Sequence, residues 1–485
     1  MATHTHIIRK QVLDLKLSSS EGAFQLQQQA GNYYHHQLLP VLEKIFDELC
    51  GPDETIQMDK LEINLGVLKV KNIEATVWND EIYQLLKKQI SEQIGKPGSK
   101  KIVTHIAAKD NAGRQWLFYM QHGYLNWNTI LPDEKWYSGV LESLATDFVL
   151  VEAVRKLITE NNNALQRIVA GHPVSFLVHL VTVMTAKKFQ QLALLADEIA
   201  NILFYWFKKI KKESKSENEI LLSVWKNIIR LSAGASVKNN MDEVFIENVI
   251  KKNITPAVSA VAAMQLKDKL VITGQIIKEM ADEYLQNNKN AKQENSVADE
   301  QRNDEIISDK SNNTESIDEE GIFVQHAGMV LLHPFLATFF KRLNLIESGN
   351  FKNIACRQKA MLLLHYLTTG NTNAKEYELV MPKVICAWPL QQAVSFTGTI
   401  TVAELEEADN LLESVIAKWD KLKNSSAAAL QENFLQRNGK VFTKNESVVV
   451  QIEHGSLDVL LDFLPWSINI IKLPWIKEMI RVEWR

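Results

Sequence analysis

Apolar residues recur at two different periods along the chain, and the period changes with position. Near the start, apolar and polar side chains partly alternate over Thr5–Leu17 and again over Thr55–Leu65. Between these stretches, Ser18–Ser20 can cap a helix that is interrupted near Gly31 and Pro40. Because alternation is typical of a half-buried strand, residues 1–78 are predicted to form a strand–helix–strand unit.

From residue 79 to residue 285 the apolar residues recur every three or four positions. Leu141, Leu144, Phe148 and Val151 are one example, and this spacing places them on one side of a helix. Gly and Pro residues interrupt the pattern at several points, and sustained heptads are absent. The pattern therefore predicts several packed helices and not one long rod.

A polar stretch, residues 286–320, separates this helical part from the rest of the chain. It contains ten acidic and four basic residues, so its net charge is −6, and it has few large apolar side chains. Such a composition cannot bury enough apolar surface to offset the entropy lost on folding. We therefore expect an acidic, polar, disordered linker over residues 286–320.

Residues 321–485 are predicted to be helical, with β-structure near their end. The expected helices cover Ala327–Leu345 with a restart at His333-Pro334, Lys359–Thr369 closed by Gly370, the helix opened by the Thr401–Glu404 capping box, and Ser426–Gln436. A hairpin is expected over Lys440–Glu453. The predicted fold is mainly α with small β elements (α+β), with compact helical units at both ends of the linker and short strands at the N-terminus and C-terminus.

Tryptophans recur every nine residues near the end of the chain. Leu-Pro-Trp occurs at Trp466 and at Trp475, and Trp484 follows at the same interval. These rings are either core residues of a small sheet or anchors for a protein partner. For the second case, the candidate partner-binding residues are the three tryptophans with Arg481 and Arg485.

Composition narrows the class of protein. The chain has 485 residues with 46% hydrophobic and 23% charged residues, as is usual for globular proteins, and its net charge of −4 argues against a nucleic-acid partner. Three cysteines do not suggest a disulfide framework and fit a reducing compartment. No signal peptide is visible, and Ile168–Ala186 reads as a buried helix and not as a membrane span because it contains two histidines and a proline.

Motifs that carry chemistry are missing. The sequence contains no Gly-rich phosphate loop, no G-x-S-x-G elbow and no His-Glu-x-x-His pair. His172 and His179 lie seven residues apart without a nearby acid, so we expect core or surface histidines, and Cys386 in an apolar run is expected to be buried and inert. We therefore expect no enzyme activity, no catalytic or metal site, no cofactor and no small-molecule ligand.

Several segments, in the same order along the chain, resemble a known family. They are His6–Leu13, Met58–Gly66, Val330–Leu336, Leu363–Gly370, Glu376–Val380, Leu422–Ser426, Phe434–Arg437 and Ile470–Trp475. Over most of its length the chain resembles the contractile injection system tape measure proteins of phage-tail-like particles. One departure is Ala387, which follows Cys386 where the family tends to have Gly, and it affects only local packing.

The resemblance implies a structural role and supplies no catalytic residues. A tape measure protein sits in the growing tail tube and sets its length, so the implied partners are tail tube, baseplate or other particle proteins. The implied location is the cytoplasm during assembly, with release inside an injection particle as a further option. Because eleven prolines and the linker do not fit a continuous rod, a second hypothesis is a helical binding scaffold or chaperone-like adaptor for assembly of a large complex.

Overall fold

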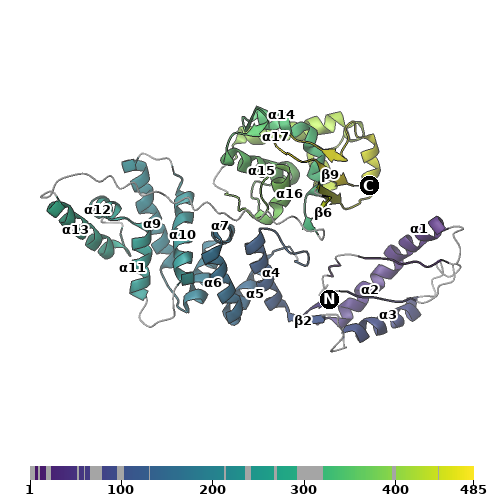
Figure 1. The fold of residues 1–485 in the computed structure, drawn as a ribbon, viewed down its shortest axis with the longest axis horizontal. Helices are drawn as coiled ribbons and strands as arrows, with labels where there is room; N and C mark the ends of the chain where they lie inside the picture. The colour runs from purple at the N-terminus through teal and green to yellow at the C-terminus, as the bar shows by residue number, and fades with distance from the viewer. Residues whose placement is uncertain are drawn as a thin grey trace. The chain divides into compact units, whose positions relative to one another are not determined.

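The chain is mainly α-helical with a few short strands, as predicted (Figure 1). The computed structural model describes residues 6–8, 11–17, 23–51, 54–58, 60–65, 79–94, 103–129, 131–211, 215–234, 242–266, 270–291, 321–395, 400–445 and 447–484. It divides into two compact units, one comprising Met1–Gln115 and Trp127–Asp147 and the other comprising Trp116–Asn126 and Phe148–Arg485. The domain boundaries expected at residues 78, 285 and 320 remain predictions.

The first unit is built around a pair of packed helical segments. α1 (Ala23–Tyr33) continues through a π-helical turn (Tyr34–Leu38) into α2 (Leu39–Leu49), so the expected interruption is a change of helix type. Pro40, which has no backbone N–H to donate, lies directly after this π-helical turn, in the first turn of α2. α3 (Asn79–Ile94) packs on α2, and their shared core contains Leu38, Leu42, Ile45, Leu86 and Ile90.

Strand pairing in this unit differs from the prediction. β1 (Glu54–Met58) is shorter than expected, and it pairs antiparallel with β2 (Val103–Ala107), which the sequence pattern did not indicate. The strand expected over Thr5–Leu17 is wrong for the described residues 6–8 and 11–17, which form no strand and leave Val12 and Leu15 exposed. Alternation alone does not make a strand, since a strand also needs a hydrogen-bonded neighbour.

Residues 60–65 are extended but are held by side chains and not by a strand. The side-chain amide of Gln89 accepts from the Asn64 N–H at 2.9 Å and donates to the Asn64 carbonyl at 2.8 Å. Gln93 makes the same pair of contacts with Glu62, at 3.4 and 2.7 Å. Two glutamines one helical turn apart therefore satisfy alternate residues of the extended backbone, as a neighbouring strand would.

Two further helices complete this region. α4 (Ala108–His122) contributes residues to both units, and α5 (Glu134–Thr146) lies in the first unit. The Asp133 carboxylate caps α5 by accepting from the Trp136 N–H at 2.7 Å. The α4 helix ends at Gly123, whose φ of 81° is the left-handed conformation that favours glycine.

The helical part of the second unit follows the predicted pattern. Its helices are α6 (Phe148–Glu160), α7 (Asn162–Gly171), α8 (Val174–Thr185), α9 (Leu192–Tyr205) with a π-helical extension (Trp206–Lys211), α10 (Glu217–Gly234), α11 (Asp242–Asn253), α12 (Pro256–Gln265) and α13 (Gly274–Ala291). α10 is central, because it contacts α6, α7, α8, α9 and α11. α13 continues through Gln286 to Ala291 and so extends into the stretch expected as a linker; residues 292–320 lie outside the described residues, and the linker remains a prediction.

The C-terminal part of this unit combines helices with a sheet. Its helical elements are η6 (Ala327–Leu332), α14 (His333–Arg342), α15 (Ile354–Thr369), η7 (Glu376–Leu379), α16 (Val380–Ile385), α17 (Val402–Lys418), η8 (Asp420–Leu422), α18 (Ala427–Leu430), η9 (Gln431–Leu435) and η10 (Asp458–Phe463). The predicted restart at His333-Pro334, the Gly370 helix end at φ 71° and the Thr401 capping box are all confirmed.

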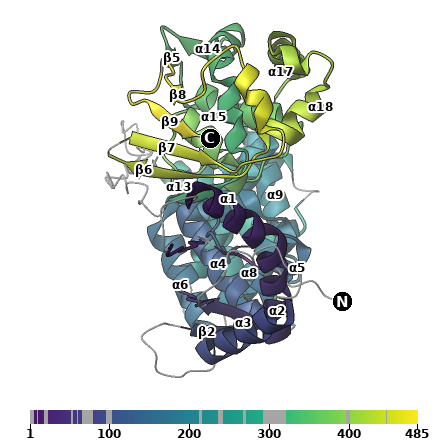
Figure 2. The same ribbon diagram turned by 90° about the vertical axis from the view of Figure 1, so that its right-hand side faces the viewer.

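The sheet of this part has five strands in the order β3-β6-β7-β9-β8. Figure 2 shows β6, β7, β9 and β8 in this order. They are β3 (Ile322–Val324), β6 (Gly439–Lys444), β7 (Ser447–Ile452), β9 (Ile480–Glu483) and β8 (Ile470–Ile471). The predicted hairpin is β6–β7, and only the β7–β9 pair is parallel. A separate small hairpin joins β4 (Ile346–Glu347) to β5 (Asn350–Phe351).

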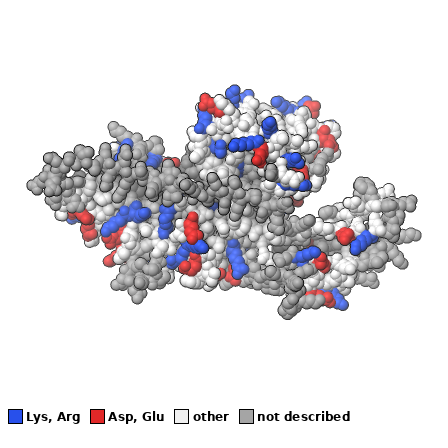
Figure 3. All heavy atoms as spheres, viewed as in Figure 1, with Lys and Arg blue, Asp and Glu red and all other residues white. Residues whose placement is uncertain are grey.

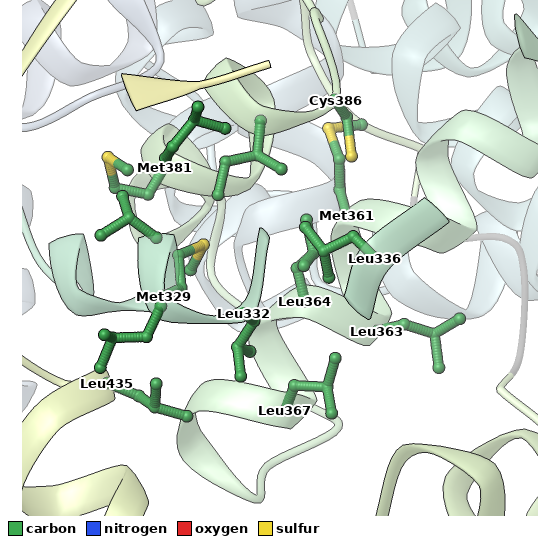
Figure 4. Close-up of a cluster of buried hydrophobic side chains, with 14 of the residues drawn as sticks. Met329, Leu332, Leu336, Met361, Leu363, Leu364, Leu367, Met381, Cys386 and Leu435 are labelled. Atoms are coloured by element: carbon green, nitrogen blue, oxygen red, sulfur yellow. The ribbon is translucent and has the colours of Figure 1, made fainter. Parts of the chain in front are cut away.

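One large apolar core joins the sheet to the helices. Figure 4 shows part of it, where Met329, Leu332, Leu336, Met361 and Leu435 meet from η6, α14, α15 and η9. Gly328 allows η6 and η9 to approach closely, because a Cβ at this position would lie 1.7 Å from the Phe434 carbonyl oxygen. This core is the framework for the features described next.

Candidate functional site

The structure places two of the three repeated tryptophans in the core. Trp475 is 7% exposed, donates from Nε1 to the Ile385 carbonyl at 2.8 Å, and packs against the rings of Phe340 and Phe351. Trp484 follows β9 and is 3% exposed. A partner anchor needs an exposed ring, so these two side chains act as core residues in this conformation.

The other candidate partner residues have different surroundings. Trp466 is half-buried and lies edge-on to Phe335, with 5.2 Å between ring centroids. Arg481 is exposed on β9, on the side of the sheet that faces away from the core. Arg485 lies outside the described residues. Partner binding through this set of three tryptophans with Arg481 and Arg485 remains a prediction.

A buried ionic cluster joins α7 to η7 and α16. Glu376 Oε1 accepts from Arg167 Nε at 2.9 Å and from Lys383 Nζ at 2.7 Å. The side chains of Arg167, Glu376 and Lys383 are 0%, 4% and 1% exposed, so the whole cluster is removed from water. Buried charges are tolerated only when they are paired and hydrogen-bonded, and this cluster has one carboxylate for two cations.

Backbone carbonyls accept further hydrogen bonds from both cations. Arg167 donates from Nη1 to the carbonyls of Met120 and Gln121, at 2.8 and 3.3 Å, and from Nη2 to the carbonyl of Gln391. Lys383 donates to the carbonyl of Leu390 at 2.9 Å. Four separate chain segments are therefore fixed to one another by two cationic side chains.

Two neighbouring features support the same joint. A Cβ on Gly123 would lie 2.7 Å from Arg167 Nη2, so only glycine leaves room for the guanidinium there. Asn163 Oδ1 accepts from the Ala393 N–H at 3.0 Å, which fastens α7 to the same C-terminal loop. The cluster has no exposed reactive group, and its geometry fits a structural tie between the helical part and the C-terminal part.

Burial also changes the acidity of this cluster. It lowers the pKa of Lys383 to about 8, although the adjacent Glu376 carboxylate acts against that change. The ammonium is therefore held in the folded protein at a cost. The sequence signal for it is a single lysine inside the apolar run Val380–Cys386, but neither its partner Glu376 nor the second cation Arg167 could be identified from sequence.

Two histidines and a glutamate form a second, partly buried group. His365 Nε2 lies 3.2 Å from Glu378 Oε2, and His365 Nδ1 lies 3.0 Å from the Asn371 carbonyl, so both ring nitrogens have partners. Burial lowers the pKa of His326 to about 4, and the adjacent His365 adds to this effect. Burial acts to raise the pKa of Glu378, but hydrogen bonds from His365 and the Lys375 amide outweigh it and lower the pKa.

His172 is a buried core histidine, as one of the two predicted alternatives has it. Trp116 Nε1 donates to His172 Nε2 at 2.9 Å, and His172 Nδ1 lies 2.9 Å from the Ile168 carbonyl. This arrangement fixes the neutral ring with its proton on Nδ1, and burial lowers its pKa to about 4. Burial likewise raises the pKa of the Cys386 thiol, so this cysteine is not a reactive thiolate.

A metal centre and a membrane span are two further classes of site that the described ranges could hold. Within these ranges, no group of three His, Cys, Asp or Glu side chains could hold a metal ion. Among the helices the structure describes, none is long and apolar enough to cross a membrane. Charged side chains of both signs are interspersed on the face shown in Figure 3.

Comparison with known proteins gives one match. The sequence model of the family described as contractile injection system tape measure protein matches residues 5–484, which is nearly the whole chain. No curated protein matches the chain, and no solved structure matches it. The matched span includes both units and all of the residues described above, so the chain belongs to the family of contractile injection system tape measure proteins.

Proposed function

We propose that this protein is a non-catalytic component in the assembly of a phage-tail-like contractile injection particle. The family match over residues 5–484 carries this proposal. In this role the protein binds other particle proteins, such as tail tube or baseplate subunits, in the cytoplasm while the particle is built. Its contribution to tail length then comes through these contacts.

The helices support a compact component more than an extended ruler. The longest continuous helical stretch described is α1 through α2, whose three segments of 11, 5 and 11 residues (Ala23–Leu49) span about 40 Å at 1.5 Å per residue. The ionic cluster of Arg167, Glu376 and Lys383 also fastens the helical part to the C-terminal part. Extending the chain would require breaking this cluster and the core beside it.

A deletion of residues 292–320 tests the ruler version of the proposal. This deletion leaves α13 and β3 whole, because α13 ends at Ala291 and β3 begins at Ile322. If the chain sets tail length by its own extent, electron microscopy of the mutant particles should show shorter tails. A matched control replaces the same residues with a Gly/Ser sequence of equal length, which should restore the length. Unchanged tails in the deletion mutant would contradict the ruler version and favour assembly through contacts.

The compact core also favours a second candidate, a chaperone-like adaptor that leaves before the particle is complete. The two candidates differ in where the protein is found. A particle component should be present in purified particles at a fixed ratio to tube subunits, measured by quantitative mass spectrometry. An adaptor should be missing from purified particles and present in assembly intermediates.

A further inference from the structure

The five-stranded sheet has a second face that is separate from the core. Strand alternation places one set of residues, Ile322, Val441, Val450, Val482 and Ile471, on the face that packs into the core. The residues between them point to the opposite side. We call that side the outer face. Within the strands it comprises Phe323, Lys440, Phe442, Lys444, Val449, Gln451, Ile470, Arg481 and Glu483, and we include the exposed Lys472 and Met479, which directly flank β8 and β9.

Strand register sets the order of these residues across the outer face. Phe442 pairs with Val449, Val449 with Arg481, and Arg481 with Ile470, so the four form one row across four strands. Val449 at the centre of this row is 2% exposed, although it is not part of the core beneath the sheet. An apolar centre is therefore flanked by an aromatic ring and a guanidinium.

The outer face is cationic. It contains Lys440, Lys444, Lys472 and Arg481 against one acid, Glu483, which gives a net charge of +3. Among the described residues, Lys444, Lys472 and Arg481 form no ion pair. This local excess is notable in a chain whose overall charge is −4.

The outer face also exposes apolar side chains. Phe323, Ile470 and Met479 are 40%, 55% and 53% exposed, and they lie on or next to the two edge strands and β9. Five strands at about 4.8 Å spacing make a face roughly 19 Å wide, which about six residues of an extended peptide would cross. Cationic groups beside apolar ones fit a peptide that carries both carboxylates and aliphatic side chains.

We propose that the outer face binds an acidic, extended segment of another particle protein, with carboxylates against Arg481 and Lys472 and aliphatic side chains against Ile470 and Met479. This inference rests on the proposed function for the origin of the partner. The partner is expected to be acidic because the outer face has three more cations than acids. The short cationic track and the overall charge of −4 favour a polypeptide over a nucleic acid, even though the outer face carries the rings of Phe323 and Phe442.

Fluorescence anisotropy on the full chain tests the inference. The probe is a fluorescein-labelled peptide in which Glu alternates with Val. The double variant Arg481→Glu with Lys472→Glu should weaken its binding about tenfold or more. The matched control is Lys209→Glu with Lys211→Glu, which reverses two exposed lysines of the helical part and should change binding less than about twofold.

Four outcomes would overturn the inference. They are no peptide binding, equal loss of binding in the control variant, tighter binding of a single-stranded oligonucleotide than of the peptide, and much tighter peptide binding once residues 292–320 are deleted. The last outcome would assign the outer face to the acidic segment of this chain. Failure of the proposed function is separate, because it is measured by the presence of the protein in particles and intermediates and not by peptide binding.

Discussion

The charge balance of the buried ionic cluster gives the sharpest prediction. Glu376→Gln removes the only carboxylate between Arg167 and Lys383 and leaves two buried cations without a counter-charge. Removing one partner of a buried ion pair costs about 3–5 kcal/mol of unfolding free energy. Because Glu376 Oε1 receives hydrogen bonds from both cations, we expect a loss near the upper end, about 5 kcal/mol.

Lys383→Met should behave differently. It leaves Glu376 paired with Arg167, and it removes an ammonium whose pKa falls from 10.5 to about 8 in the folded protein. At about 1.4 kcal/mol per pKa unit, holding this charge costs roughly 3 kcal/mol, which offsets the lost contacts. We therefore expect Lys383→Met to lie within about 1 kcal/mol of the wild type at pH 7.

The pH dependence has a definite sign. Below pH 8 Lys383 is protonated in both folded and unfolded states, so the full cost is present. Between pH 8 and 10.5 the folded state releases this proton before the unfolded state does, and the wild type gains stability relative to Lys383→Met. The gain should approach about 3 kcal/mol at the upper end of this range.

Urea unfolding, followed by tryptophan fluorescence and far-UV circular dichroism, measures these differences. The matched control is Glu407→Gln, which removes the carboxylate that lies 2.8 Å from Nη1 of the exposed Arg342. It should lower the unfolding free energy by at most about 1 kcal/mol. If Glu376→Gln costs no more than Glu407→Gln, the cluster is not the structural tie described here. If Lys383→Met is as damaging as Glu376→Gln, the argument from charge balance is wrong.

Three further predictions concern the core. Gly328→Ala places a methyl group against the Phe434 carbonyl and should lower stability by about 3 kcal/mol or more, whereas Gly171→Ala, with open space around it, should change the Tm little in differential scanning fluorimetry. The wild type should lose about 3 kcal/mol of unfolding free energy as pH falls from 6.5 to about 4, because the pKa of His172 is lowered in the folded state, and His172→Gln should remove this loss. Urea midpoints at pH 7 and 4.5 check this. Trp484→Ala should cost about 3–5 kcal/mol in urea unfolding, and a small effect would contradict its placement in the core.

Local signals in the sequence predicted the helix ends of the C-terminal part. Gly370 closes α15 and the Thr401 capping box opens α17, because each depends on residues within one helical turn. The β6–β7 hairpin is also local and was predicted with its turn. Features set by a few neighbouring residues could therefore be identified without the fold.

Features that depend on residues far apart in the sequence could not be identified in this way. Arg167 and Glu376 are 209 residues apart, so no spacing rule connects them. The sequence pattern did not predict β2 for the same reason, because α3 separates it from its partner β1 along the chain. The strand expected over Thr5–Leu17 shows the converse error, in which a suitable pattern finds no neighbour among the described residues. The outer face could be anticipated only through Arg481, because strand register brings the other cations beside it.

The strand order has a consequence for how the chain is made. β3 lies at one edge of the sheet and pairs with β6, where Ile322 meets Val441, 119 positions further along the chain. During translation α14, α15 and α17 therefore emerge before β6, β7, β8 and β9. The last of these strands, β9, lies between β7 and β8 in the sheet. Strand pairing between residues far apart in the sequence slows folding, and until the sheet forms the helices expose apolar surface. A fragment that stops short of residue 480 would contain every helix of this part and still aggregate, because its core would lack Ile480, Val482 and Trp484 and its sheet would lack the strand between β7 and β8.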